Sequence, residues 1–542
     1  MRNSRTLTMA VAVVIASALV GGLFGGRVMA GQDSLSQHYE AFTKALAAIE
    51  TTYVGEVDSE RLVYGAIGGL LQTLDPHSSF MDPRSYAQLR QRQRGRYYGV
   101  GMTINVIDDA ITVRGLFEGS PAYRAGIRRG DVIARIAGED APRTSAEAVE
   151  LIVGPRGSTV LVSIRRRGYA ELIDLEVERD EITIPTVQGA FMIDDTIGYV
   201  RLRDFSDTSS RELRAALREL DELGMEGLLL DLRDNGGGPL DQAIRVSNEF
   251  LPRGDLIVYT RGRIQNSDQD YHAREDGDHN DLPLVVLVNR NSASASEIVS
   301  GAIQDHDRGL IVGETTFGKA LVQSVHQISE GAGLFLTTAR YYTPSGRLIQ
   351  RPWDATFDEY RYSERDLKPA DHALSERRLT DGGREVFGGG GIEPDYVMAG
   401  PIEGFAPTAL GRRLAARQEF ADFAERFSAE GDTRIKVAGR GRQRVSRGFV
   451  IDDAMMADFR SQLESRGLTI DDEAEEAFAS DEAFIRAMMH YEIDIALFGL
   501  AAARRSLTAS DPQVRYAVTL FPEAVRLLNV SRQTDAVAAR RN

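Results

Sequence analysis

The stretch that decides the fold is Leu284-Val285-Val286-Leu287-Val288-Asn289-Arg290-Asn291-Ser292-Ala293-Ser294-Ala295-Ser296-Glu297. Its first five residues form an unbroken apolar run, which predicts a strand buried on both faces, as in a parallel sheet. The polar loop then leads into residues 298–303, which read as a helix. Residues 227–232 repeat the pattern, with a glycine-rich loop after an apolar run. Beyond Ile184-Pro185 the chain is therefore predicted to be an α/β domain whose functional site lies in such loops.

The serine loop supports two interpretations. Ser294 and Glu297 fit a capping box, in which the serine oxygen accepts from a backbone amide and the glutamate accepts from the amide of the serine. Alternatively, a serine at a strand-to-helix turn exposes its hydroxyl as a nucleophile, and the flanking alanines leave room for a substrate backbone. The first amides of the helix would then point at a developing oxyanion. The residues of this loop alone leave both interpretations open.

A serine nucleophile needs a base. His306 follows twelve residues later, at the far end of the predicted helix, which is more than about 15 Å away at helical rise. Lys319 stands in Gly313-Glu314-Thr315-Thr316-Phe317-Gly318-Lys319-Ala320, which also begins like a phosphate-binding loop. Ala320 lacks the hydroxyl with which such a loop binds magnesium, and residues 321–327 alternate like a strand where the loop requires a helix. Nucleotide binding is therefore disfavoured.

Lys319 suits the role of base when its amine is partly buried. An apolar pocket lowers the pKa of a lysine from about 10.4 toward 7, which makes the neutral amine available. Gln323 lies four residues later on an alternating strand, so we expect it on the same face as Lys319, where it orients the amine. The amides of Gly236, Gly237 and Gly238 can form an anion-binding concavity. A lysine at the surface and a tight glycine turn are the structural alternatives.

These motifs occur together in one known family. Residues 292–297, Thr316-Phe317-Gly318-Lys319 with Gln323, and the run from Leu232 to Gly238 resemble the carboxyl-terminal processing (tail-specific) serine peptidases. Ser294 and Lys319 are 25 positions apart, as the family pattern expects. Flanking motifs at residues 74–80 and 390–395 also resemble that family. The resemblance covers residues 35–400 and implies nothing about the remainder of the chain.

A small β-rich module precedes the α/β domain. Its β-rich runs, separated by glycine-rich turns, are residues 102–106, 111–113, 132–136 and 160–164, and residues 145–153 read as a helix. Tyr98-Gly99-Val100-Gly101, Gly119-Ser120-Pro121-Ala122 and Gly130-Asp131-Val132-Ile133 are similar to a PDZ domain. Such a domain adds a peptide strand to a sheet edge and receives the terminal carboxylate at a glycine-rich loop, here Gly99-Val100-Gly101.

The resemblance implies a fold and a set of roles. The fold class is multidomain α/β, with a ClpP/crotonase-like protease core, an inserted PDZ-like β-rich domain and an N-terminal helical segment. The spacing of apolar residues beyond residue 400, and not the resemblance, adds a C-terminal helical extension. Ser294 is implied as the nucleophile, Lys319 as the general base and Gln323 as its orienting partner. The amides of Ala295 and of either Gly237 or Gly238 are implied as the oxyanion hole.

The expected organisation of the chain has five parts. They are a signal peptide or signal anchor at 1–30, an N-terminal helical region at 35–94, the PDZ domain at 95–180, the peptidase core at 181–400 and a C-terminal helical domain of unknown role at 401–542. Two amphipathic helices are expected before the turn at residues 74–80. The Met and Phe residues that recur at helical spacing beyond residue 400 are expected to form a core.

Composition and the N-terminus narrow the function and the location of the 542-residue chain. Cysteine is absent, which excludes disulfides, a cysteine nucleophile, thiolate zinc sites and cysteine-linked lipid anchors. The formal charge of −16 disfavours nucleic-acid binding. Residues 6–26 are uncharged and follow two arginines, so they are long enough to span about 30 Å of bilayer once and to direct the remainder outward. We expect the protein on the periplasmic side of the inner membrane, anchored by this segment or released after Ala30.

The expected function is that of a serine endopeptidase with a Ser/Lys dyad. It would recognise apolar carboxyl-terminal tails of exported or misfolded proteins and cleave them. No cofactor and no metal is expected. The expected partners are proteins or peptides with free apolar carboxyl termini, the membrane through the N-terminal segment, and an adaptor protein or a second copy of the chain. The alternatives are a non-catalytic PDZ peptide-binding scaffold and a crotonase-like acyl-CoA enzyme, because related folds support different chemistries.

Overall fold

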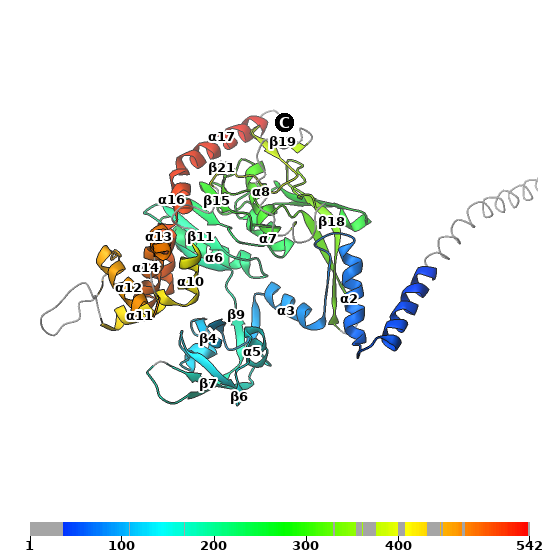
Figure 1. Cartoon of the computed structure of the whole chain (residues 1–542). Helices are drawn as coiled ribbons and strands as arrows, with labels where there is room; N and C mark the ends of the chain where they lie inside the picture. The colour runs from blue at the N-terminus through cyan, green and yellow to red at the C-terminus, as the bar shows by residue number, and fades with distance from the viewer. Residues whose placement is uncertain are drawn as a thin grey trace, which may run out of the picture. The chain divides into compact units, whose positions relative to one another are not determined.

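The computed structural model describes residues 36–107, 109–166, 168–328, 331–353, 360, 376–398, 407–430, 445, 448–468 and 472–539 (Figure 1). The chain divides into two compact units, Met1–Asp82 and Pro83–Asn542. Within the described residues, no helix is both long and apolar enough to cross a membrane. The apolar run at residues 6–26 and the cleavage site after Ala30, on which the expected location depends, lie outside the described residues.

The first unit is helical where the sequence predicted helices. Residues 36–52 form a helix, and α2 (Ser59–Gln72) follows, with the side chain of Asp58 accepting a hydrogen bond in its first turn. Asp75 closes the predicted turn by accepting hydrogen bonds from the amides of His77 and Ser78, at 2.8 and 2.7 Å. The strand β1 (Ser79–Met81) ends the unit.

The β-rich module begins the second unit after α3 (Pro83–Gln93). Its sheet has the order β3-β4-β5-β7-β8. These strands are β3 (Met102–Ile107), β4 (Ala110–Leu116), β5 (Val132–Ile136), β7 (Thr159–Arg165) and β8 (Ile173–Glu178), with β6 (Glu139–Asp140) paired to β5. The helices are α4 (Pro121–Arg124) and α5 (Ser145–Ile152), and β2 (Arg96–Gly99) pairs with β9 (Asp180–Thr183). Each predicted strand of this module is confirmed, and β3 lies at the edge of the sheet.

A six-stranded sheet forms the centre of the α/β domain. Its order is β10-β11-β12-β15-β16-β21, and all neighbours are parallel except β10 with β11. The strands are β10 (Val187–Met192), β11 (Ile197–Leu202), β12 (Gly227–Asp231), β15 (Leu284–Val288), β16 (Leu310–Gly313) and β21 (Tyr396–Val397). Every residue of β12 and β15 is buried, as predicted from their apolar runs. The fold class expected from the sequence is confirmed.

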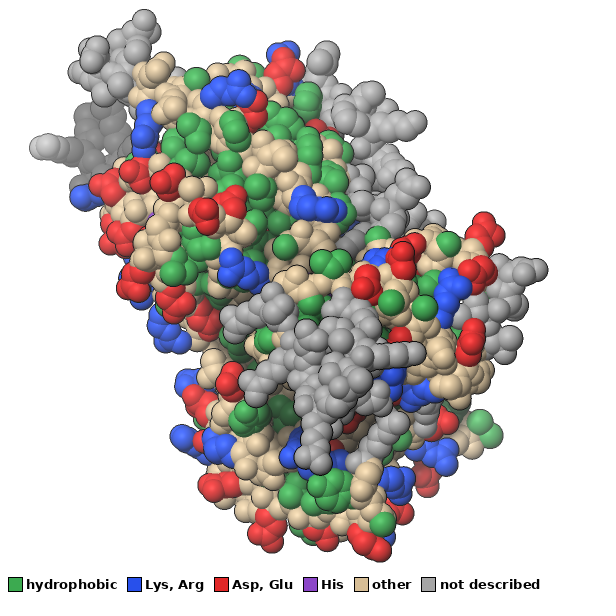
Figure 2. Space-filling model, turned by 90° about the vertical axis from the view of Figure 1, so that its left-hand side faces the viewer, with side chains coloured by type: hydrophobic (Ala, Val, Ile, Leu, Met, Phe, Trp, Pro, Cys, Tyr) green, Lys and Arg blue, Asp and Glu red, His purple; other side chains and the backbone are tan. Residues whose placement is uncertain are grey.

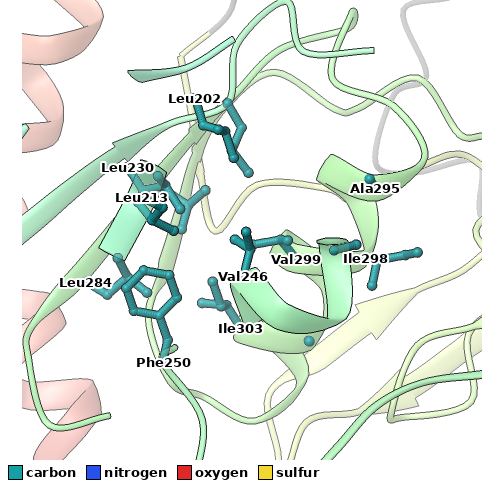
Figure 3. Close-up of a cluster of buried hydrophobic side chains, with 14 of the residues drawn as sticks. Leu202, Leu213, Leu230, Val246, Phe250, Leu284, Ala295, Ile298, Val299 and Ile303 are labelled. Carbon is teal, nitrogen blue, oxygen red and sulfur yellow. The ribbon is translucent and has the colours of Figure 1, made fainter. Parts of the chain in front are cut away.

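Three helices cover one face of this sheet: α6 (Ser209–Glu222), α7 (Leu240–Asn248) and α8 (Ala295–Asp305). Figure 3 shows the side chains of Leu230, Val246 and Val299, from β12, α7 and α8, in the apolar layer between the sheet and the helices. All eleven residues of α8 are buried. The helix that follows the serine loop is therefore held rigidly against the sheet.

A second sheet has the order β17-β18-β13-β14 within this unit. Its strands are β17 (Leu321–Gln327), β18 (Gly333–Tyr342), β13 (Leu256–Gly262) and β14 (Gln269–His272), with the short helix η1 (Gln265–Ser267) between the last two in sequence. A further hairpin joins β19 (Arg377–Leu379) to β20 (Glu385–Phe387). Because Lys319 leads into β17 and not into a helix, the structure excludes the phosphate-binding loop.

The C-terminal part of the chain is helical, as predicted. It contains α10 (Ala409–Ala416), α11 (Glu419–Glu430), α12 (Asp453–Ser465), α13 (Asp472–Ser480), α14 (Glu482–Phe498), α15 (Leu500–Ser510), α16 (Pro512–Thr519) and α17 (Phe521–Ala539). The predicted core residues Phe423, Phe427, Met455 and Phe459 are buried together in one cluster. The helices α16 and α17, drawn in red in Figure 1, pack instead on the central sheet, on the face that α6, α7 and α8 leave uncovered.

Charged side chains are interspersed on the described surface. On the face shown in Figure 2, lysines and arginines alternate with aspartates and glutamates over the described residues, with no continuous basic stripe among them. The sequence has 80 acidic and 64 basic residues, so acidic side chains are in excess overall.

Candidate active site

Three loops meet at one edge of the central sheet. They follow β12, β15 and β16, which are parallel neighbours, so their carboxyl ends lie side by side. The first loop carries the three glycines, the second carries Ser294 and the third carries Lys319. The carboxyl edge of parallel strands is the usual position of functional sites in α/β folds. The structure therefore brings together the three motifs that the sequence analysis selected.

The glycine loop and the serine loop are bonded to each other. The carbonyl oxygen of Asn235 accepts hydrogen bonds from the Ala293 amide at 3.0 Å and from the Ser296 hydroxyl at 2.9 Å. A Cβ atom added at Gly237 would lie 2.8 Å from the Cβ of Ser294 and 2.6 Å from the Ala293 carbonyl oxygen. Only glycine fits at this position, because real side chains do not approach so closely. The two loops therefore form one tightly packed unit.

Ser294 has a backbone conformation that is rare for a residue with a side chain. Its φ is 56° and its ψ is −110°, and the Ser296 amide donates to the Ala293 carbonyl at 3.1 Å. These angles match the second residue of a type II′ turn, which normally favours glycine. Strained backbone of this kind concentrates at functional sites, as in the sharp strand-to-helix turn that exposes a nucleophilic serine. The predicted capping box with Glu297 is confirmed, so Ser294 also begins α8.

Glu297 is fully buried and connects the serine loop with the lysine loop. Its Oε2 accepts the backbone N–H of Ser294 at 2.7 Å and that of Lys319 at 2.9 Å. Its Oε1 accepts the Gly318 amide and the Thr316 hydroxyl, each at 2.6 Å. Both nitrogens that share Oε2 are therefore no farther apart than the sum of those two distances. Ser294 and Lys319, 25 positions apart in sequence, are close in the structure through this one oxygen.

The pKa of Glu297 reflects this position. Burial raises the pKa of its carboxyl group from the ordinary 4.5 to about 7, and the hydrogen bonds from Thr316, Lys319, Gly318 and Ser294 offset only part of that effect. All four groups donate, so the ionised carboxylate is the form that accepts all of them. Glu297 therefore changes its charge near neutral pH at the point where the two loops meet.

Tyr341 provides a second connection between the same two residues. Its hydroxyl lies within hydrogen-bonding distance of the Ser294 carbonyl oxygen, at 3.2 Å, and of the Lys319 carbonyl oxygen. The side chain is 1% exposed and comes from β18 in the second sheet. Glu297 receives the backbone N–H groups of the two residues, and Tyr341 approaches their carbonyl oxygens. The sequence contains no local signal for this role, because Tyr341 lies 47 positions after Ser294.

Lys319 lies just before β17, and Gln323 lies within that strand. Lys319 is half-buried and lies two residues before β17 begins. The pairing of β17 with β18 shifts register between Val322 and Gln323, which is the mark of a β-bulge. The extra residue is Thr338 of β18, because Val322 pairs with Ala339 and Gln323 pairs with Thr337, so β17 itself carries no inserted residue. The Gln323 amide group donates to the Thr337 hydroxyl at 3.4 Å.

The two candidate oxyanion glycines differ in their surroundings. The Gly237 amide donates to the Asn235 side-chain oxygen at 2.9 Å, so it is already engaged. A Cβ atom added at Gly238 would lie 2.2 Å from the Phe205 carbonyl oxygen. Both positions therefore require glycine for steric reasons, and Gly237 has a hydrogen-bond acceptor of its own.

His306 is held apart from the serine loop. It is the C-cap of α8, at the opposite end of the helix from Ser294, as predicted. Its Nδ1 lies 2.7 Å from Asp381 and its Nε2 lies 2.7 Å from the Leu256 carbonyl oxygen. Burial alone would lower the pKa of His306, but these two partners raise it to about 9. The imidazole is therefore protonated at neutral pH and cannot accept a proton from a nucleophile.

The predicted peptide-binding loop, Gly99-Val100-Gly101, joins β2 to the edge strand β3. Gly101 has a φ of 77°, which favours glycine, and a Cβ atom there would lie 2.4 Å from the Cβ of Ser120. The Val100 carbonyl accepts the Ala122 amide at 2.8 Å, so the start of α4 fixes the loop. In the part of the chain that the structure describes, no group of three or more acidic or histidine side chains could hold a metal ion.

Three family models match separate parts of the chain. Residues 196–355 match peptidase family S41, residues 112–166 match a PDZ domain, and residues 27–85 match the N-terminal domain of the activating protease CtpB. The first match contains the serine loop, the lysine loop and the glycine loop. The second lies within the β-rich module, whose similarity to a PDZ domain is thereby confirmed.

Named relatives support the same assignment. The chain is 39% identical over 307 residues to the carboxy-terminal-processing protease of Bartonella bacilliformis, covering 56% of this chain and 70% of that protein. It is 34% identical over 346 residues to the carboxy-terminal processing protease CtpA of Bacillus subtilis, covering 63% of this chain and 73% of that protein. A solved structure of a photosystem II D1 C-terminal processing protease is 32% identical, with 57% of this chain and 89% of that chain covered and a TM-score of 0.33.

These findings set aside the two alternative functions, the non-catalytic scaffold and the acyl-CoA enzyme. The relatives named above are processing proteases, and they align over about two thirds or more of their own length. The chain belongs to peptidase family S41 and is a serine-type carboxyl-terminal processing endopeptidase.

Proposed function

We propose that Ser294 and Lys319 form the catalytic dyad of this endopeptidase. The observation that carries the proposal is the pair of buried side chains, Glu297 and Tyr341, that bracket the backbone of both residues. The strained turn at Ser294 adds to it, because such strain persists where the surrounding structure supports a function. Lys319 is half-buried beside the serine loop, and lysine is a residue type that proteins use as a general base.

The reaction has two halves. Neutral Lys319 Nζ takes the proton of the Ser294 hydroxyl while Oγ bonds to the peptide carbonyl carbon, and the carbonyl oxygen becomes an oxyanion. The C–N bond then breaks, and the leaving amine takes the proton from Lys319. In the second half, a water molecule gives its proton to Lys319 and attacks the acyl carbon. The Ser294 oxygen leaves with that proton, which restores both residues.

The oxyanion hole is proposed to consist of the Ala295 and Gly238 amides. Ala295 is the first residue of α8, so its N–H lies at the positive end of the helix. Gly238 is preferred to Gly237, because the Gly237 amide already donates to Asn235. Gln323 is proposed to orient the Lys319 amine, because it lies four residues later on the strand that Lys319 enters.

The PDZ domain is proposed to select substrates by an apolar carboxyl-terminal tail. Its strand β3 is at the sheet edge, where an added peptide strand finds unpaired backbone groups. The helix α5 contacts β3, and Val149 on this helix is 42% exposed. An apolar tail gains from burial against such a side chain. The carboxylate of the tail would bind at Gly99-Val100-Gly101.

We propose the domain organisation and the cellular location of the protein from its sequence patterns. The boundaries are 1–30 for the signal or anchor, 35–94 for the helical region, 95–180 for the PDZ domain, 181–400 for the peptidase core and 401–542 for the C-terminal helices. Export is proposed from the apolar run at residues 6–26, which follows two arginines. Exported or misfolded proteins are then the substrates, and an adaptor or a second copy of the chain is a partner to test.

Digestion of an unfolded exported protein tests the dyad. Ser294→Ala and Lys319→Ala should each abolish new carboxyl termini in mass spectra, while circular dichroism shows unchanged folding. Lys319→Arg retains the positive charge but cannot become neutral, and it should also be inactive. Turnover by any of the three purified variants would refute the dyad.

A further inference from the structure

The C-terminal helices, for which the sequence suggested no role, complete the peptidase sheet. On the face opposite α8, Val514, Ala517, Leu520, Phe521 and Ala524 are buried against residues of β11, β12, β15 and β16. Leu229 and Val285, at the centre of that cluster, are both 0% exposed. Without α16 and α17 this apolar face of the sheet would be open to water, at a cost that scales with the area exposed.

At Gly227, the lack of a side chain leaves room for the contact between the sheet and α17. A Cβ atom added at Gly227, the first residue of β12, would lie 2.6 Å from a ring carbon of Phe521. The aromatic ring therefore lies directly on the backbone of the strand. The strand β12 ends four residues later at Asp231, where the glycine loop begins. Phe521 of α17 therefore contacts the first end of the strand that leads to the glycine loop.

At the second end of β12, Arg233 joins the glycine loop to the start of α16. Its Nη1 donates to the Gln513 side-chain oxygen at 2.7 Å and lies 2.8 Å from Asp511 Oδ2. Its Nε and Nη2 donate to the two oxygens of Asp231, at 3.0 and 2.6 Å. Arg233 is 8% exposed and Asp231 is 0% exposed. Charge-assisted bonds in such dry surroundings hold a side chain in one geometry.

The partners of Arg233 in the C-terminal region are themselves fixed. Asp511 is the N-cap of α16 and accepts the amides of Gln513 at 2.8 Å and of Val514 at 3.4 Å. The Gln513 amide group donates to the Met398 carbonyl at 2.9 Å, just after β21. Arg233 is therefore held between Asp231, at the end of β12, and the first turn of α16. That turn is itself bound to the chain just after the edge strand β21.

We propose that Asp511 and Gln513 are positioning residues of the active site, which hold Arg233 and thereby fix the glycine loop beside Ser294. Arg233 is two residues before Asn235, whose carbonyl oxygen binds the serine loop and whose side chain binds the Gly237 amide. A shift of Arg233 would therefore move the loop against the nucleophile. The proposal rests on the proposed role of this loop as the oxyanion hole.

The double variant Asp511→Asn with Gln513→Leu tests the proposal in the full chain. It removes the charge and the side-chain acceptor that face Arg233, while the introduced asparagine keeps an oxygen to cap α16. We expect kcat to fall about tenfold with KM unchanged, because a displaced oxyanion donor weakens binding of the transition state and not of the substrate. A peptide aldehyde, which forms a tetrahedral oxyanion on the serine, should bind about tenfold more weakly by the same argument.

Two controls separate positioning from general stability. Leu520→Ala opens a cavity under the same helices without touching Arg233, and Asp452→Asn makes the same chemical change at the N-cap of α12. If Leu520→Ala lowers the melting temperature as far as the double variant and also lowers kcat equally, the proposal is wrong. An unchanged kcat in the double variant would also overturn it. Turnover by Ser294→Ala would instead refute the proposed dyad. If the double variant does not fold, Asp511→Asn alone serves with the same readouts.

Discussion

Ser294 and Lys319 donate their backbone N–H groups to the same oxygen atom, Oε2 of Glu297. The Tyr341 hydroxyl lies within hydrogen-bonding distance of the carbonyl oxygens of the same two residues. Two buried side chains, Glu297 and Tyr341, thus connect the backbones of the proposed nucleophile and base. Variants of Ser294 and Lys319 therefore test the chemical step, whereas variants of Glu297 and Tyr341 test how the two residues are positioned.

The pH dependence of stability should report on Glu297. Its pKa is raised by burial from 4.5 to about 7, so the folded state holds the proton more tightly than the unfolded state. The free energy of unfolding should therefore fall as pH rises through this window, by about 3 kcal/mol in total. Denaturant unfolding of the wild type and of Glu297→Gln at pH 4.5 to 8 measures the difference, since glutamine does not titrate. Equal slopes for the two proteins would contradict the raised pKa.

Glu297→Gln should also lower activity. The amide nitrogen of glutamine donates, so two of the four donors around the side chain lose their acceptor. We expect kcat to fall at least about tenfold at pH 8, because small displacements of reacting groups are costly. Thr316→Val, which removes one hydroxyl donor and leaves the carboxylate in place, is the matched control and should fall less. An active Glu297→Gln enzyme would show that the connection is not needed for catalysis.

Tyr341→Phe removes one hydroxyl from the site and changes almost no volume. The variant should lose about 1 kcal/mol of stability, the usual worth of such a hydrogen bond. Its kcat should fall even at a temperature where the variant is fully folded, because the carbonyl oxygens of Ser294 and Lys319 lose the hydroxyl group that contacts them. Tyr342→Phe is the neighbouring control in β18, where the ring stacks on Tyr259 outside the site. Similar kinetics for the two variants would speak against a role of Tyr341 in placing the dyad.

His306 should matter for stability and not for catalysis. Its pKa is raised from 6.5 to about 9 by Asp381 and the Leu256 carbonyl, despite its burial. The stabilisation is therefore complete below pH 6.5 and is lost as pH rises through 9, with a total of about 3 kcal/mol. His306→Gln should remove this dependence and leave kcat at neutral pH unchanged when assayed below its melting temperature. A loss of kcat in fully folded His306→Gln would indicate that the histidine takes part in the reaction.

An amidated peptide should be a poor substrate. Amidation removes the negative charge that the Gly99-Val100-Gly101 loop is proposed to bind, so KM for a peptide with an apolar tail should rise at least about tenfold. Binding of free and amidated peptides to Ser294→Ala, followed by fluorescence anisotropy, isolates recognition from cleavage. Equal affinity for the two peptides would refute capture of the carboxylate.

The sequence predicted the parts of the structure that depend on local pattern. The apolar runs of β12 and β15, the strand after Lys319 and the helices beyond residue 400 all follow from the spacing of apolar residues. The three loops of the site could be selected because each carries an unusual group of small or polar residues. The resemblance to a family then suggested the roles of Ser294 and Lys319.

Other features depend on contacts that no local pattern records. Tyr341 is 47 positions from Ser294, and Gln513 is 280 positions from Arg233. The bulge that inserts Thr338 into β18, opposite Val322 and Gln323, is also not indicated by the run of residues 321–327. Glu297 was recognised as a cap of α8, but its hydrogen bonds to the lysine loop depend on how the parallel strands align.

The residues of α16 and α17 that contact Arg233 and the central sheet follow both loops of the proposed dyad in the sequence. Protein chains are made from the amino end, and their early parts start to fold first. The Ser294 and Lys319 loops exist long before the ribosome reaches Asp511, Gln513 and Phe521. Until then Arg233 lacks two of its partners, and one side of the sheet has no cover. From the positioning role proposed for Asp511 and Gln513, we expect a nascent copy to reach its full kcat only after these residues have been made.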